Sequence, residues 1–266
     1  VLIDSALACC DELIVISYTK PEHERAEPDR RRRWLAMLYP TVTRLVADDT
    51  SLAGICRSKG AELRALPPND ASDADHRDFV GWLCEAMLDR TVDAVFTSED
   101  YGDGLAAALA RRFGRSVQHV CVDRARQAVL ASGTLIRSDL HRYRGFLDPR
   151  VYADLVRRVA VLGGESSGKT SLARALADQL NTAWVPEFGR ELWERRDGRL
   201  CFPDMVHIAR EQVLREERLA QAAKDWMVCD TTPLTTRFYG EAMFGKIDPE
   251  LDRLADRRYD LIVVCE

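Results

Sequence analysis

The sequence predicts an α/β protein with two doubly wound parallel-sheet domains, one over residues 1–150 and one over residues 151–266. Short apolar runs alternate with longer helical patterns in both halves, which is typical of parallel strands covered by helices. The chain has 266 residues, 46% of them hydrophobic, which is enough for a buried core in each half. Asp148-Pro149 marks the boundary, without a flexible Gly- or Ser-rich linker.

The first half contains four apolar runs that we expect to be buried strands, at 13–17, 42–47, 93–97 and 117–122. Residues 1–10 have a helical pattern. The Pro- and Asp-rich stretch 66–75 is the most loop-like part of the chain.

The second half repeats the alternation, with expected strands at 159–162, 183–185, 226–229 and 261–265. A short helix is expected directly after Pro149, and another over 171–180. Residues 205–224 are expected to form an amphipathic helix that packs on the sheet, and nothing catalytic is required of it.

Composition narrows the classes of function. The net charge of −5 is unfavourable for nonspecific nucleic-acid binding, and the four arginines at 30–33 are expected on a solvated helix face. No apolar stretch approaches the roughly 20 residues of a membrane span, and the first residues lack the basic flank of a signal peptide. Eight cysteines without a C-x-x-C pair predict reduced thiols in a cytoplasmic protein, and the five histidines show no metal-ligand spacing.

One segment matches the phosphate-binding pattern G-x-x-x-x-G-K-[ST] in full, between a predicted strand and a predicted helix. Glycines let backbone N–H groups converge on phosphate oxygens, and a helix N-terminus favours negative charge. Lys169 is expected to contact the β- and γ-phosphates of ATP, and the Thr170 hydroxyl to ligate Mg²⁺. The alternative is a glycine-rich turn with a surface lysine. The expected ATP-binding residues are Gly163, Gly164, Glu165, Ser166, Ser167, Gly168, Lys169, Thr170 and Ser171.

Two carboxylates follow strands of the same predicted sheet: Asp230 after 226–229 and Glu187 after 183–185. The carboxyl ends of parallel strands face the ligand crevice, so one carboxylate could organise Mg²⁺ and the other deprotonate a hydroxyl. Arg190 could pair with Glu187 or contact the acceptor, meaning the molecule that receives the phosphoryl group. An ordinary N-cap or loop position is the alternative for each carboxylate.

Three segments together resemble the ribosylnicotinamide kinase domain of the bifunctional NadR-type proteins. They are Gly163–Thr170, Glu187-Phe188-Gly189-Arg190-Glu191 and Asp230–Thr236. The resemblance implies ATP and Mg²⁺ as cofactors, with nicotinamide riboside as the acceptor. Which carboxylate is the base stays open. The implied catalytic residues are Lys169, Glu187 and Asp230, the implied metal ligands are Thr170 and Asp230, and the implied acceptor site contains Glu187, Arg190, Asp230 and Tyr239.

Aromatic side chains could form a stacking wall for a cationic pyridinium ring, although core packing is the alternative for each. The candidates are Trp184, Phe188, Trp193 and Tyr239.

NadR-type proteins carry a nicotinamide-mononucleotide adenylyltransferase domain before the kinase, and residues 132–137 resemble the carboxyl-terminal signature of nucleotidyltransferases, I-S-x-T-x-I-R. The resemblance implies that Ser132, Gly133, Thr134 and Arg137 bind a nucleotide triphosphate. An N-cap followed by a surface arginine is the alternative interpretation.

The first half departs from that family in one respect. Such enzymes open with a strand and an H-x-G-H motif that stabilises charge on the attacked phosphate, and this chain has no two histidines at that spacing. We therefore expect the chain to begin after that motif and to end, at Glu266, before the arginine-bearing lid of the kinase. Adenylyl transfer is expected of the parent protein rather than of these residues.

The leading hypothesis is ATP-dependent phosphorylation of nicotinamide riboside, in a parent protein that also converts nicotinamide mononucleotide to NAD. One alternative is a sensor or transcriptional regulator that binds ATP or NAD without turnover, and another is a kinase for a different nucleoside. The expected partners are these small molecules and, through the resemblance, a second copy of the chain. Neither a nucleic acid nor a membrane is expected.

Overall fold

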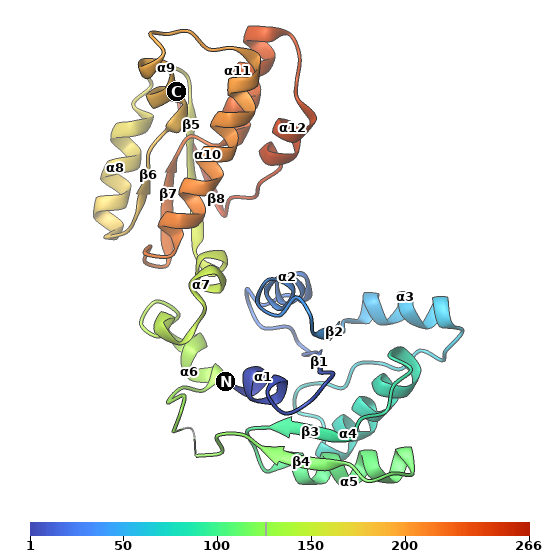
Figure 1. Cartoon of the computed structure of the whole chain (residues 1–266). Coiled ribbons are helices and arrows are strands. Elements are labelled where there is room, and N and C mark those ends of the chain that lie inside the picture. Colours follow the sequence, from blue (N-terminus) through green and yellow to red (C-terminus); the bar gives the residue numbers. More distant parts are fainter. Residues whose placement is uncertain (126) are drawn as a thin grey trace. The chain divides into compact units, whose positions relative to one another are not determined.

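The computed structural model describes residues 1–125 and 127–266, and the chain divides into two compact units, Val1–Ala131 and Ser132–Glu266 (Figure 1). This division precedes the boundary near residue 150 that the sequence predicts. Leu140 and Leu147 pack against the core of the second unit, and His141 Nδ1 lies 2.9 Å from the hydroxyl of Tyr152. The segment before residue 150 therefore belongs to the second unit.

The first unit alternates strands and helices in the order expected from its apolar runs. Its elements are α1 (Leu2–Leu7), β1 (Ile14–Ser17), α2 (Pro28–Leu38), β2 (Thr43–Val46), α3 (Asp49–Lys59), α4 (Asp73–Trp82), a π-helical turn (Leu83–Met87), β3 (Ala94–Thr97), α5 (Tyr101–Phe113) and β4 (Gln118–Cys121).

The strands of the first unit are parallel but form two separate two-stranded sheets, β1–β2 and β3–β4, instead of one sheet. One cavity of about 1050 Å³ is lined by residues of both β1 and β3, including Ile14, Ile16 and Val95. Among the described residues, no backbone pairing joins β1 to β3. The unit's core lies elsewhere, around Leu52 and Leu83, which are fully buried.

The basic run of α2 differs from the solvated face that its sequence suggests. The Arg31 side chain is only 11% exposed, and it donates to Ser17 Oγ at 2.9 Å and to Glu22 at 2.7 Å. Arg32 pairs with Asp48. These arginines are therefore partly engaged within the first unit.

The second unit begins with short helices and continues as an alternation of strands and helices. Its elements are α6 (Gly133–Ser138), a 3₁₀ turn (Arg144–Phe146), α7 (Pro149–Leu155), β5 (Arg157–Gly163), α8 (Lys169–Leu180), β6 (Trp184–Val185), α9 (Phe188–Arg195), α10 (Phe202–Ala220), β7 (Trp226–Asp230), α11 (Pro233–Phe244), α12 (Pro249–Ala255) and β8 (Leu261–Cys265).

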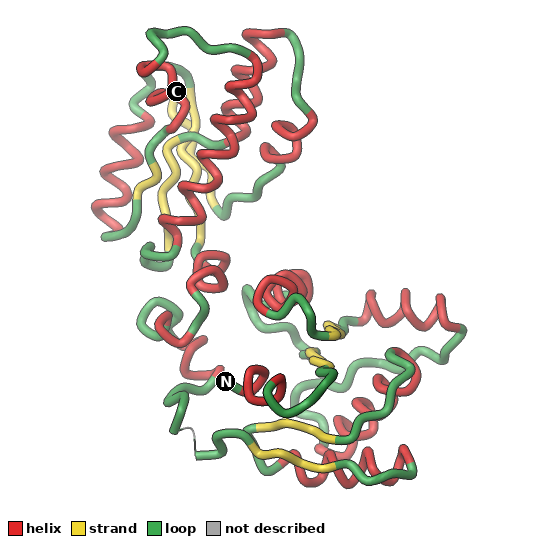
Figure 2. Tube along the Cα trace, viewed as in Figure 1, coloured by secondary structure: helices red, strands yellow, loops and turns green. Residues whose placement is uncertain are grey.

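A four-stranded parallel sheet in the order β6-β7-β5-β8 organises this unit, with helices on both sides of it (Figure 2). Val161 and Val228 pack with Ala173 and Ala177 of α8 on one face. On the other face, Met227 belongs to a core shared with α7 and the end of α10. Helices on both faces of a parallel sheet give a doubly wound arrangement, and the order places β5 between β7 and β8. No helix among the described residues is both long and apolar enough to cross a membrane.

Candidate functional site

The phosphate loop connects β5 to α8, as its sequence pattern predicts. Gly163 has a φ of +146°, and an added Cβ there would lie 2.4 Å from the carbonyl oxygen of Cys265 on the neighbouring strand. Gly168 is the N-cap of α8 with a φ of +85°. Both positions require glycine, because side chains rarely adopt these conformations and a Cβ at Gly163 has no space.

Lys169 is the first residue of α8 and is only 6% exposed. Its Nζ donates a hydrogen bond to the carbonyl oxygen of Gly164 at 2.5 Å, so the ammonium group curls over the loop. A phosphate oxygen at the same place would offer this cation a charged partner in exchange for a neutral one. Thr170 follows it in the first turn of the helix.

Asp230 ends β7, where it pairs in register with Val161 of β5, two residues before the phosphate loop starts. The side chain is 1% exposed, and its Oδ1 has no hydrogen-bond partner among the described residues. The buried Thr232 hydroxyl likewise has no partner in this part of the chain. Unpaired buried oxygens beside a phosphate loop fit a hard cation such as Mg²⁺, which takes oxygen ligands from one or two carboxylates and from phosphates.

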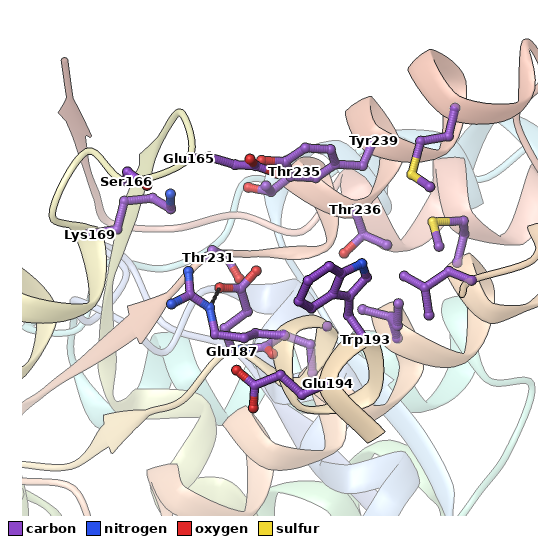
Figure 3. A pocket seen from close by; sticks show the side chains of 17 residues that line it. Glu165, Ser166, Lys169, Glu187, Trp193, Glu194, Thr231, Thr235, Thr236 and Tyr239 are labelled. Carbon is purple, nitrogen blue, oxygen red and sulfur yellow. Dashed lines mark ion pairs between the residues drawn. The ribbon is translucent and has the colours of Figure 1, made fainter. Parts of the chain in front are cut away.

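Glu187 is the N-cap of α9, two residues after the end of β6. Its side chain is 19% exposed, and its Oε2 lies 3.5 Å from Nε of Arg190, the ion pair marked in Figure 3. Burial raises the pKa of the Glu187 carboxyl, Arg190 acts in the opposite direction, and the negative charge of Asp230 raises it further. A carboxylate with a raised pKa is a better proton acceptor near neutral pH than an ordinary glutamate.

A cavity of about 430 Å³ lies between the phosphate loop and α9 (Figure 3). Glu165, Ser166 and Lys169 line it from the phosphate loop, whereas Glu187 and Arg190 line it from α9. The rest of the wall comes from α9, α10, α11 and the loops next to them. Those residues are Gly189, Trp193, Glu194, Leu200, Met205, Ile208, Gln212, Thr231, Thr235, Thr236, Tyr239 and Met243.

The four candidate aromatic residues divide into two pairs. Trp193 and Tyr239 line the cavity and are 51% and 36% exposed. Phe188 is buried in the core with Leu192, so it has the core-packing role that was the alternative to the stacking wall. Trp184 lies beneath the guanidinium of Arg174, 4.3 Å from the ring centroid, and does not line the cavity.

Helix α10 contributes residues to the site that its sequence does not indicate. The sequence predicts an amphipathic helix that packs on the sheet, and Met205, Ile208 and Gln212 also line the cavity. These positions share one helix face. Their apolar and amide side chains have no motif, so the sequence carries no signal that separates them from ordinary core residues. For Trp193 the sequence does carry a signal, since this residue is one of the aromatic candidates for the stacking wall.

The four residues proposed for triphosphate binding lie at the start of the second unit, in the N-cap and helix α6. The Ser132 hydroxyl accepts a hydrogen bond from the Leu135 N–H at 3.0 Å, and Arg137 donates to the Thr134 hydroxyl at 3.4 Å. Ser132, Gly133, Thr134 and Arg137 do not line the cavity at the phosphate loop. Their contacts are local, and their role in nucleotide binding stays a prediction.

Comparisons with known proteins agree with the motifs. Residues 158–266 match the family described as AAA domain. The chain is 31% identical, over 179 residues, to the trifunctional NAD biosynthesis/regulator protein NadR of Escherichia coli strain K12, a match that covers 65% of this chain and 42% of that protein. The NadR of Salmonella typhimurium strain LT2 is 32% identical over 155 residues, which are 56% of this chain and 38% of that protein. The matches thus cover about two fifths of the length of each relative.

Two solved structures share the fold across 98% of the chain. A NadR protein in complex with NAD and AMP-PNP superposes with a TM-score of 0.56 at 23% identity, over 75% of its length. A NadR protein in complex with NR superposes with a TM-score of 0.54 at 22% identity, over 73% of its length.

Proposed function

We propose that this chain, which sequence and fold match to the NadR-type proteins, transfers the γ-phosphoryl group of ATP to the 5′-hydroxyl of nicotinamide riboside. The product is nicotinamide mononucleotide, and the step belongs to NAD biosynthesis. The observation that carries the proposal is the single cavity into which both the phosphate loop and the Glu187 carboxylate open.

ATP binds with its phosphates along the loop, where backbone N–H groups and the start of α8 receive them. Lys169 leaves the Gly164 carbonyl oxygen and neutralises the β- and γ-phosphates. The Thr170 hydroxyl and the unpartnered Oδ1 of Asp230 are the groups that would hold Mg²⁺. The ion supplies positive charge for the transferring phosphoryl group.

Glu187 is the base in this proposal. Its carboxylate takes the proton of the acceptor hydroxyl as the oxygen bonds to the γ-phosphorus, and ADP leaves with the electrons of the broken phosphorus–oxygen bond. We assign the role to Glu187 rather than Asp230 because Glu187 lines the cavity, whereas Asp230 does not and is almost fully buried.

The remaining wall suits a cationic ring. Trp193 and Tyr239 offer aromatic surfaces, and burial together with Glu165 and Glu187 raises the pKa of Tyr239, so its phenol stays neutral. The carboxylates of Glu165 and Glu194 add negative charge to the same wall. A pyridinium is attracted by both aromatic faces and carboxylates. The NadR structure solved with NR supports this acceptor.

The second activity of the parent protein, conversion of nicotinamide mononucleotide to NAD, is a further proposal that rests on the resemblance alone. Residues 132–137 support it in this chain through their resemblance to the nucleotidyltransferase signature.

The test incubates the full-length protein with Mg²⁺-ATP and nicotinamide riboside and measures nicotinamide mononucleotide by chromatography. We expect product from wild type and its loss in Lys169→Ala, with circular dichroism as the control for folding. A parallel reaction with nicotinamide mononucleotide tests for NAD. Tight ATP binding without any product would favour the sensor, and phosphorylation of cytidine or adenosine in its place would favour a kinase for another nucleoside.

A further inference from the structure

The Gln212 side chain is the least expected polar group at the cavity. It lies on α10, lines the cavity with Met205 and Ile208, and is only 2% exposed. Buried amides normally have hydrogen-bond partners at both ends, because an unpaired donor has lost its water without replacement. Among the described residues, Gln212 has a hydrogen-bond partner at one end only.

The orientation of the amide follows from chemistry. The Phe188 N–H donates to Oε1 of Gln212 at 3.0 Å, and only the oxygen of an amide can accept that bond. The NH₂ end is therefore fixed as the free end. Its Nε2 has no hydrogen-bond partner among the described residues, and it is buried from solvent.

The position of this free donor connects it with the reaction. Phe188 directly follows Glu187, so Gln212 holds the chain next to the proposed base. Of the two α10 residues that line the cavity with it, Ile208 has no polar atom and the Met205 thioether sulfur is only a weak acceptor. An oxygen of a molecule bound in the cavity would supply the missing hydrogen-bond acceptor for Nε2.

We propose that Nε2 of Gln212 donates a hydrogen bond to an oxygen of the acceptor nucleoside, which makes Gln212 a specificity-determining residue. The inference rests on the proposed kinase function for the identity of the acceptor. The oxygen belongs either to a ribose hydroxyl or to the carboxamide of the base, because both accept a hydrogen bond from an amide. A site with this donor discriminates strongly against an acceptor that lacks the oxygen, since the buried donor is then left unpaired.

Two variants separate this role from the structural bond to Phe188. Gln212→Glu keeps an oxygen that accepts the hydrogen bond of the Phe188 N–H but removes the NH₂ donor. The assays are made at roughly pH 8, where a carboxylate cannot donate a hydrogen bond. Gln212→Met removes both groups at similar volume. Gln221→Glu, at the exposed end of the same helix, is the matched control for the change of charge.

We expect KM for nicotinamide riboside to rise about 10- to 100-fold in Gln212→Glu and in Gln212→Met, while KM for ATP stays within about threefold. Thermal unfolding should show that Gln212→Glu is folded, and Gln221→Glu should match wild type in every measurement. An unchanged KM for the acceptor in folded Gln212→Glu would overturn the proposal.

Acceptor analogues identify the oxygen. The analogues lack the 2′-hydroxyl, the 3′-hydroxyl or the carboxamide oxygen. The binding of each analogue to wild type and to Gln212→Glu is measured as a thermodynamic cycle, in which the protein and the ligand are changed separately and together. The analogue without the recognised oxygen should bind wild type poorly and lose nothing further in the variant. Equal additional losses for all three analogues in the variant would contradict a direct hydrogen bond.

Failure of the proposed function has a different signature. If wild type forms no nicotinamide mononucleotide, calorimetry measures the binding of nicotinamide riboside, cytidine and adenosine to wild type and to Gln212→Glu. A nucleoside whose binding weakens at least tenfold in the variant would support the role of Gln212 for that nucleoside. Equal binding of all three to both proteins would overturn it.

Discussion

Replacement of Glu187 by glutamine tests the assignment of the base. The amide has nearly the same size and cannot accept the proton of the acceptor hydroxyl. The ion pair it removes joins a carboxylate that is 19% exposed to an Arg190 side chain that is 53% exposed, so its loss costs less than about 1 kcal/mol of stability. The variant should therefore fold as wild type does.

The expected loss of rate follows from the role of the group. A positioned general base contributes about 10²- to 10⁴-fold, which corresponds to roughly 3–5 kcal/mol of transition-state stabilisation. Lys169 and Asp230 are not altered by the change, so kcat should fall by this factor while KM for ATP stays within about threefold. Steady-state kinetics with each substrate varied separately measure both constants.

The pH profile gives a second readout. Glu187 acts when deprotonated, and burial raises its pKa above the ordinary 4.5, with the charge of Asp230 acting in the same direction. Wild-type kcat/KM should therefore fall with decreasing pH through a limb that lies above that value. In Glu187→Gln this limb should disappear. A kcat reduced less than tenfold, or an acid limb that persists in the variant, would refute the assignment, and Asp230 would then be the carboxylate to test as base.

Two further predictions replace other charged side chains. Arg190→Met removes the cation that lowers the pKa of Glu187, so the acid limb should move to higher pH in the rate profile; an unmoved limb would contradict the contact. Glu216 is fully buried, with its carboxylate 2.7 Å from Nε of Arg257 and 2.8 Å from the Tyr259 hydroxyl. Glu216→Ala removes the buried acceptor of both donors, although Arg257 keeps its ion pair with Glu217. It should reduce the free energy of unfolding by about 1–3 kcal/mol in a urea titration, whereas no measurable loss would contradict the prediction.

The sequence located the strands closely because their apolar runs are short, β-branched and bounded by polar turns. The runs 93–97 and 261–265 correspond to Ala94–Thr97 and Leu261–Cys265, and the run 159–162 lies within the longer strand Arg157–Gly163. The phosphate loop was equally readable, since its glycines are required by backbone geometry that a pattern can express.

Pairing between strands was less accessible, because it depends on neighbours distant in the chain. Four strand runs in the first half suggested one sheet, but the structure has two, and residues of β1 and β3 line a cavity in common. The division between the units lies earlier in the chain than the boundary predicted near residue 150, for a related reason. His141 and Leu147 are assigned by their contacts with Tyr152 and its neighbours, which no local pattern encodes.

Helix α10 shows why part of the cavity wall could not be predicted from the sequence. The apolar residues Val206, Ala209, Val213 and Leu219 indicate an amphipathic helix, yet of these four only Ala209 is buried. The buried positions of the helix are Asp204, Met205, Ile208, Ala209, Gln212, Glu216 and Ala220. Gln212 and Glu216 are polar, so an apolar periodicity cannot find the face on which they lie. Polar groups on a buried face cost stability unless they are paired, and conflicts of this kind concentrate at functional or strained sites. Glu216 is paired within the protein, whereas Nε2 of Gln212, a residue that lines the cavity, has no hydrogen-bond partner among the described residues. Substitutions one turn apart on this helix should therefore separate stability from acceptor binding.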